Sequence, residues 1–199
     1  MPALRALLIL GLGVPGILQA ETPASPVPVE IAYDDGTRER FVVWNQPGNG
    51  VAVRFTVGAG SSLLGVRFFI TSAPFTNPLG ICVLDATGPG GAPGDTLHAY
   101  FEEPLDSRSG FQNVAFPAPI ELASPDFYVV YLQTGWGSGD SNTFGIDTSS
   151  PPDGRSWRFE DGVWSHMALP DGDVMIRAVI ATETPVAPVT WGQVKALYE

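Results

Sequence analysis

The stretch Ser156–Ala181 constrains the fold more than any other part of this chain. Asp161-Gly162 and Asp171-Gly172 interrupt it, and Asp-Gly between apolar runs is a strong hairpin signal. Along each run, side chains alternate between apolar and polar, as they do in a strand with two different faces. The pattern therefore predicts antiparallel strands with aromatic residues on the inner face. The runs are Ser156–Phe159, Val163–His166 and Val174–Ile180.

The remainder of the chain continues this pattern through about a dozen short strands. Gly and Pro account for 23 and 19 of the 199 residues, and they fall between the apolar runs. Regularly spaced short strands with turn residues between them are typical of a two-sheet sandwich. We therefore predict an all-β, antiparallel, jelly-roll-like β-sandwich. Its predicted core contains Val53, Phe55, Phe68, Ile70, Val129, Trp157, Phe159, Trp164, Ile176 and Ala178.

The first twenty residues have the composition of a secretory signal. Arg5 precedes the apolar run Ala6–Leu18, and Ala20 is a small residue at the expected cleavage position. The apolar run is shorter than the ~20 residues that a membrane-spanning helix needs. We predict a signal peptide over 1–20, a Pro-rich leader over 21–28 and a sandwich domain over 29–182. The protein is therefore expected to be secreted or held at the cell surface, without a membrane span.

The charge of the chain excludes one class of partner. The chain has 10 Lys and Arg residues and 21 Asp and Glu residues, so its formal net charge is −11. Nucleic acids and anionic lipids need a basic protein surface, so neither is an expected partner. The single Cys82 lies in an apolar run and has no second cysteine, so the fold must hold without a disulfide.

Residues 183–199 form a Pro-containing linker followed by a short amphipathic tail. Thr190 and Gln193 fit a capping box, and one helical face carries Trp191, Val194, Leu197 and Tyr198. A helix this short is marginal when isolated in water. The sequence leaves two roles open: docking on the sandwich, or recognition by export or attachment machinery.

Several motifs resemble a β-sandwich module of secreted bacterial and archaeal proteins. They are Tyr33-Asp34-Asp35-Gly36, Asp126-Phe127-Tyr128-Val129, Asp153-Gly154-Arg155-Ser156-Trp157 and Ile176-Arg177-Ala178. Modules of this kind accompany extracellular subtilisin-like peptidases and are regarded as non-catalytic. The resemblance extends over roughly residues 30–182. It implies a non-enzymatic role in adhesion or protein interaction.

The residues themselves give little support to an enzyme. Gly139-Asp140-Ser141 is similar to part of a serine-protease motif, and His98 precedes it, but the following glycine is replaced by Asn142. One cysteine and two histidines cannot complete an ordinary zinc site. We therefore predict a protein without catalytic residues.

Calcium is the candidate cofactor, as a structural ion. Aspartate-rich turns present the hard oxygen ligands that Ca²⁺ prefers, although Asp-Gly turns also form for backbone reasons alone. The chain has no EF-hand spacing. The candidate ligands are Asp34, Asp35, Asp147, Asp153, Asp171 and Asp173.

Two tryptophans in predicted loops suggest an alternative function. Trp44 and Trp136 lie outside the clear strand positions, and exposed tryptophans can stack on sugar rings. The leading prediction is a secreted, non-catalytic β-sandwich module for adhesion or protein interaction at the cell surface, with an extracellular protein or polysaccharide as its partner. The alternative is a carbohydrate-binding module that contacts a polysaccharide through Trp44 and Trp136.

Overall fold

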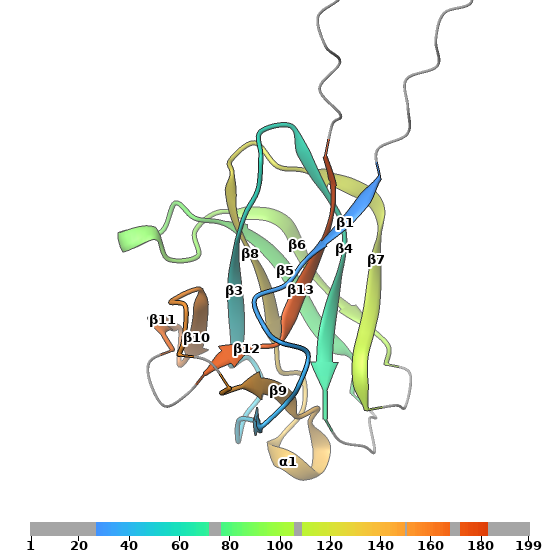
Figure 1. The fold of residues 1–199 in the computed structure, drawn as a ribbon. Coiled ribbons are helices and arrows are strands. Elements are labelled where there is room, and N and C mark those ends of the chain that lie inside the picture. Colours follow the sequence, from blue (N-terminus) through green and yellow to red (C-terminus); the bar gives the residue numbers. More distant parts are fainter. Residues whose placement is uncertain (1–26, 72–76, 106–108, 150, 168–171, 183–199) are drawn as a thin grey trace, which may run out of the picture.

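The computed structural model describes residues 27–71, 77–105, 109–149, 151–167 and 172–182. In these residues two antiparallel sheets pack face to face (Figure 1). The predicted all-β, two-sheet sandwich is therefore confirmed. The predicted signal peptide, most of the leader, and the linker and tail over 183–199 lie outside the described residues.

The larger sheet of the described residues has seven strands. Its main order is β1-β13-β4-β9-β12; β2 pairs with β9, and β7 pairs with β4. The long strands β4 and β7 form one side of the sheet, whereas β2, β9 and β12 are short. The bounds are β1 Pro28–Ile31, β2 Arg40–Val42, β4 Ser61–Ile70, β7 Gly110–Glu121, β9 Phe144–Asp147, β12 Asp173–Val174 and β13 Ile176–Thr182.

Within the described ranges, the smaller sheet has six strands in the order β11-β10-β3-β8-β5-β6. Two single helical turns, η1 (Pro89–Gly91) and α1 (Gly137–Asp140), lie in connections. The strand bounds are β3 Gly50–Thr56, β5 Leu79–Asp85, β6 Thr96–Glu103, β8 Asp126–Leu132, β10 Ser156–Glu160 and β11 Val163–His166.

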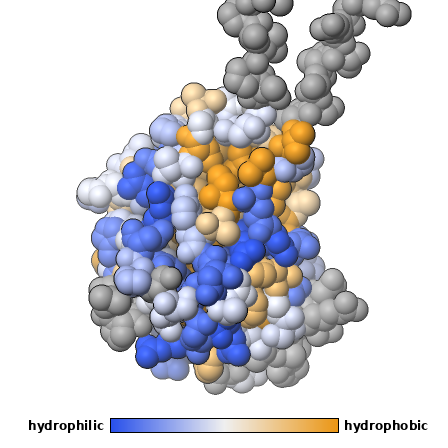
Figure 2. Space-filling view, viewed as in Figure 1, coloured by the Kyte–Doolittle hydropathy of each residue, from blue (hydrophilic) through white to orange (hydrophobic). Residues whose placement is uncertain are grey.

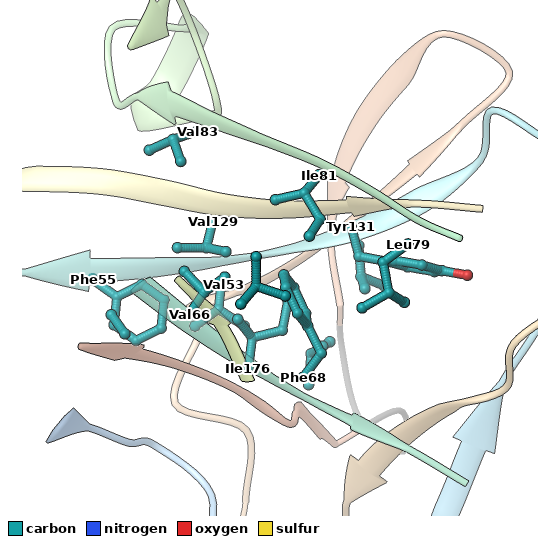
Figure 3. Packing of buried hydrophobic residues seen from close by; sticks show 14 of the residues in the cluster. Val53, Phe55, Val66, Phe68, Leu79, Ile81, Val83, Val129, Tyr131 and Ile176 are labelled. Carbon is teal, nitrogen blue, oxygen red and sulfur yellow. The ribbon is translucent and has the colours of Figure 1, made fainter. Parts of the chain in front are cut away.

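The main core lies between the two sheets. Val53 and Phe55 from β3 meet Phe68 from β4 and Ile176 from β13, and all four are almost completely buried (Figure 3). Phe55 stacks on Phe127 with 5.5 Å between ring centroids. The alternation of apolar residues in these strands fills the space between the sheets, as predicted.

The two Asp-Gly motifs have different roles. Asp161 and Gly162 both have positive φ and join β10 to β11 in a tight hairpin, as predicted. Gly172, also at positive φ, instead precedes β12, which pairs with β9 in the opposite sheet. The second motif therefore marks a crossing between sheets rather than a hairpin.

The face assigned to the aromatic residues of β10 and β11 was wrong. Trp157 pairs with Ala52 and lies in a second apolar cluster on the outer face of the smaller sheet, where its ring meets Tyr128 edge-to-face. Phe159 and Trp164 pack against each other and are only partly buried. The inner positions of β10 belong instead to Ser156 and Arg158, which pair with Val53 and Val51.

Cys82 belongs to the same outer cluster as Trp157. It is buried, and this burial raises the pKa of its thiol to about 11. The thiol is therefore protonated at neutral pH and behaves as a small apolar group, in agreement with its sequence context.

Candidate functional site

Three carboxylates gather beside the short strands β2 and β9. Asp35 and Glu39 come from the connection between β1 and β2, and Asp147 ends β9. Strand β2 pairs with β9, and the Glu39 amide donates to the Ile146 carbonyl, so the two segments lie side by side. One oxygen from each carboxylate lies within 4.8 Å of the others. We call Asp35, Glu39 and Asp147 the acidic turn cluster.

Hydrogen-bond donors surround the acidic turn cluster. Asp147 is only 3% exposed and accepts the amides of Asp35 and Ser149, each at 2.8 Å. Burial alone raises the pKa of Asp147, but these bonds and the Ser149 hydroxyl outweigh it and lower the pKa. Hydrogen bonds from the Thr37 side chain, its amide and Ser149 likewise lower the pKa of the exposed Asp35. These hydrogen bonds therefore favour the charged forms of Asp35 and Asp147.

The geometry of the acidic turn cluster fits a hard cation. Carboxylate oxygens from two turns converge, and Ca²⁺ accepts six to eight oxygen ligands in flexible geometry. The structure brings together two of the predicted ligands, Asp35 and Asp147. Sequence reasoning missed Glu39, whose carboxylate also accepts the Thr148 amide at 2.8 Å. Only the pairing of β2 with β9 places it there.

Asp34 is not part of the acidic turn cluster. Its carboxylate, with no exposed side-chain surface, forms an ion pair with Arg177 of β13. Arg177 also pairs with Glu30, and its guanidinium lies 4.1 Å from the centroid of the Phe111 ring. Asp34 therefore has a structural role, and its position does not support the prediction that it binds a metal.

Asp153 and Asp173 form a separate pair. The Asp153 amide and the Ser156 hydroxyl both donate to Asp173 Oδ1 over 3.4 Å. Asp173 is 5% exposed; burial, together with the charge of Asp153, raises its pKa to about 6. Asp171 lies outside the described residues. The pKa of Asp173 is thus raised, whereas the pKa values of Asp35 and Asp147 are lowered.

The two candidate tryptophans differ sharply in exposure. Trp44 is buried in the main core, and its indole N–H donates to Glu160 Oε1 over 2.7 Å. The side chain of Gln133 bonds to the backbone of both Trp44 and Gly135, so the two loops are neighbours. Trp136 is 65% exposed. The prediction that both rings are open to solvent is wrong for Trp44.

The two residues considered for catalysis come from different parts of the fold, His98 from β6 and Ser141 from the residue after α1. The His98 ring lies 5.2 Å from the rings of both Phe101 and Phe116, and Ser141 is buried. No hydrogen bond joins His98 to Ser141 in the described part of the chain.

The remaining surface is mixed in character. Figure 2 shows hydrophobic residues gathered over β1 and β13 beside a hydrophilic area; the exposed Val27 and Val29 lie at the start of β1. Among the described residues, no helix is long and apolar enough to cross a membrane.

Comparison with known proteins gives one sequence relative and one structural match. No family model matches the chain. It is 33% identical over 187 residues to Bacillopeptidase F of Bacillus subtilis (strain 168). The alignment covers 88% of this chain but 13% of that protein, so the chain spans about an eighth of its relative's length.

The structural match is to the cysteine protease and lectin-like domains of Cwp84, a surface layer associated protein of Clostridium difficile. It has a TM-score of 0.50 and 17% sequence identity, and covers 68% of this chain and 32% of the other. This likeness concerns the fold alone, and it agrees with the two-sheet architecture of the described residues.

Proposed function

We propose that this protein is an exported, non-catalytic β-sandwich module that binds a protein at the cell surface or in the medium. The observation that carries the proposal is the alignment, in which nearly the whole chain corresponds to a small part of a protein named as a peptidase. A segment of that size is what an accessory module occupies in a larger enzyme. The signal-like N-terminus and the acidic composition support an extracellular setting.

Carbohydrate binding is the second candidate. One of the two domains named for the structural match is lectin-like, and Trp136 offers an exposed ring for stacking on a sugar. Because Trp44 is buried, Trp136 would have to stack on the sugar ring without the second tryptophan that the sequence predicted. We therefore rank protein binding first.

We further propose that the acidic turn cluster binds a structural Ca²⁺ ion. Asp35, Glu39 and Asp147 would supply carboxylate ligands, and the ion would tie the β1–β2 connection to the end of β9. This role is structural and assigns no chemistry to the metal.

An envelope-binding assay separates the two functions. Purified full-length protein is incubated with isolated envelopes of the native host, and the bound fraction is measured by sedimentation. We expect binding to disappear after the envelopes are treated with a protease and to persist after polysaccharide hydrolysis. Trp136→Ala should leave this binding unchanged. The reverse pattern, with loss of binding in Trp136→Ala, would establish the carbohydrate-binding alternative instead.

A further inference from the structure

Strand β1 carries an apolar row that starts in the main core and ends in solvent. Ile31 and the following Tyr33 pack against the main core, and the Tyr33 ring centroid lies 5.5 Å from that of Phe55. Val29, two residues before Ile31, pairs with Ile180, which is 1% exposed, so Val29 projects on the same side of the sheet. Val29 is nevertheless 49% exposed. The two sheets therefore leave the end of this row uncovered.

Neighbouring residues extend the row into a patch. Val27, directly before β1, is 74% exposed, and Val179 of β13 is partly buried. Figure 2 shows hydrophobic residues gathered over these two strands. We call Val27, Val29 and Val179 the β1–β13 patch. Covering it would stabilise the fold, because the hydrophobic effect grows with the apolar area removed from water.

The chain itself leaves the sandwich beside this patch. Pro28 pairs with Ala181, and β13 ends one residue later at Thr182, so β1 begins where β13 ends (Figure 1). Residues 183–189 then connect Thr182 to the C-terminal tail, Thr190–Glu199. Seven residues extend to at most about 25 Å, whereas neighbouring strands lie about 5 Å apart. The linker is therefore long enough for the tail to reach the patch.

The tail has the apolar residues that a cover needs. Its predicted helical face carries Trp191, Val194, Leu197 and Tyr198. Residues 21–26, the other segment next to the patch, have the sequence ETPASP and contain no large apolar side chain. A second copy of the chain is disfavoured by the net charge of −11, because like charges repel. Composition and charge thus favour the tail over the other two occupants.

We propose that the C-terminal tail docks on the β1–β13 patch and seals this end of the sandwich. Trp191 and Leu197 would pack on Val27 and Val29. A helix as short as the tail is marginal when isolated in water. A short tether, however, gives it an effective concentration in the millimolar range, so that a weak contact is sufficient. This docking is independent of the binding function proposed above.

Methyl NMR of the full-length protein tests the contact. Trp191→Ala removes an aromatic ring, and such a ring shifts the signals of the methyl groups on which it packs. We expect the methyl signals of Val27 and Val29 to move and those of Val163 to stay. Val163 is the matched control because it is 67% exposed and lies on β11 of the smaller sheet, apart from β1 (Figure 1). Unchanged signals of Val27 and Val29 would overturn the proposal.

Combined substitutions measure the same contact through stability. Trp191→Ala together with Leu197→Ala should lower Tm by about 2–6 °C, because apolar burial is lost. Val29→Ser should lower Tm less in this tail variant than in the wild type, since the contact is already absent there. Val163→Ser should give the same shift in both backgrounds. Differential scanning calorimetry measures all four, and equal shifts from Val29→Ser in the two backgrounds would contradict the docking.

Two further results would identify a different role for the patch or the tail. A Tm that rises with protein concentration, with a dimer in analytical ultracentrifugation, would assign the patch to a second copy of the chain. Unchanged Tm and methyl signals in the tail variant, together with lost export in the native host, would assign the tail to export or attachment machinery. Either result would overturn the docking.

Discussion

Asp147 and Asp173 are paired across β9 and β12, yet the pKa values of their carboxyl groups are shifted in opposite directions. The pKa of Asp147 is lowered, whereas that of Asp173 is raised to about 6. Both residues are buried, at 3% and 5% exposure. Burial raises the pKa of both carboxyl groups, but only at Asp147 do other contacts outweigh it.

The difference lies in the donors that reach each carboxylate. Asp147 accepts two amides at 2.8 Å and the Ser149 hydroxyl at 2.6 Å. Asp173 Oδ1 receives two donors at 3.4 Å, and the neighbouring carboxylate of Asp153 adds repulsion. Short, numerous donors stabilise a buried negative charge, while long ones leave the cost of desolvation dominant. Of the two sites, the acidic turn cluster is the one at which we propose a cation.

The largest expected effect is the loss of Asp147. Asp147→Ala removes the acceptor of the Asp35 and Ser149 amides and should lower the free energy of unfolding by about 3 kcal/mol. Urea denaturation at pH 7 measures this. Asp35→Ala is the control; its carboxylate is exposed, so the cost should be below about 1 kcal/mol. Equal costs for the two variants would mean that the donors around Asp147 do not govern the site.

Calcium should have the next largest effect. Extracellular Ca²⁺ sites commonly have Kd near 10⁻⁴–10⁻³ M, so 10 mM Ca²⁺ should stabilise the protein by about 1–3 kcal/mol relative to chelator. Differential scanning calorimetry should show a rise of several degrees in Tm. Glu39→Gln should reduce the response, and Asp173→Asn should keep it. Identical Tm values in chelator and Ca²⁺ would remove the ion from the acidic turn cluster.

A comparison of β3 and β4 with β10 shows what alternating sequence patterns can and cannot predict. Alternation in β3 and β4 predicts both the strands and their inner faces, because one face of each meets the opposite sheet. In β10 the alternation is equally clear, but the outer face of the smaller sheet carries its own apolar cluster, including Ala52, Tyr128 and Val130. An apolar row therefore does not identify the inner face, and Trp157 was assigned to the wrong layer.

Long-range contacts account for the errors at the candidate sites. The burial of Trp44 depends on Glu160 and Gln133, which lie 116 and 89 residues further along the chain. Glu39 joins Asp147 only because β2 pairs with β9. Asp34 and Asp35 are adjacent in sequence, yet one binds Arg177 and the other joins the acidic turn cluster. Local composition marks acidic turns; it does not say which carboxylates meet.

The smallest stability effect should come from Asp173, and its sign should be opposite to that of Asp147. Because the pKa of Asp173 is about 6 in the folded protein and its ordinary value is 3.8, the folded protein binds an additional proton between these pH values. Stability from this group is fully present below about pH 3.8 and is lost as the pH rises through 6. The lowered pKa values of Asp35 and Asp147 act the other way, since their contribution is lost as the pH falls below about 4.

Replacing Asp173 with a neutral side chain of the same shape isolates its contribution. Two pKa units correspond to nearly 3 kcal/mol, and the exposed Asp153 carboxylate is screened by solvent, so we expect about 1–2 kcal/mol. Asp173→Asn should be more stable than wild type by this amount at pH 8 and equal to it near pH 4, as measured by urea denaturation at each pH. Asp153→Asn should give a smaller gain in stability at pH 8, because burial raises the pKa of Asp173 more than the charge of Asp153 does. The opposite result would be a wild type that becomes more stable than Asp173→Asn as the pH rises from 5 to 8. It would mean that the donors at 3.4 Å stabilise the charged form of Asp173, and the contrast with Asp147 would fail.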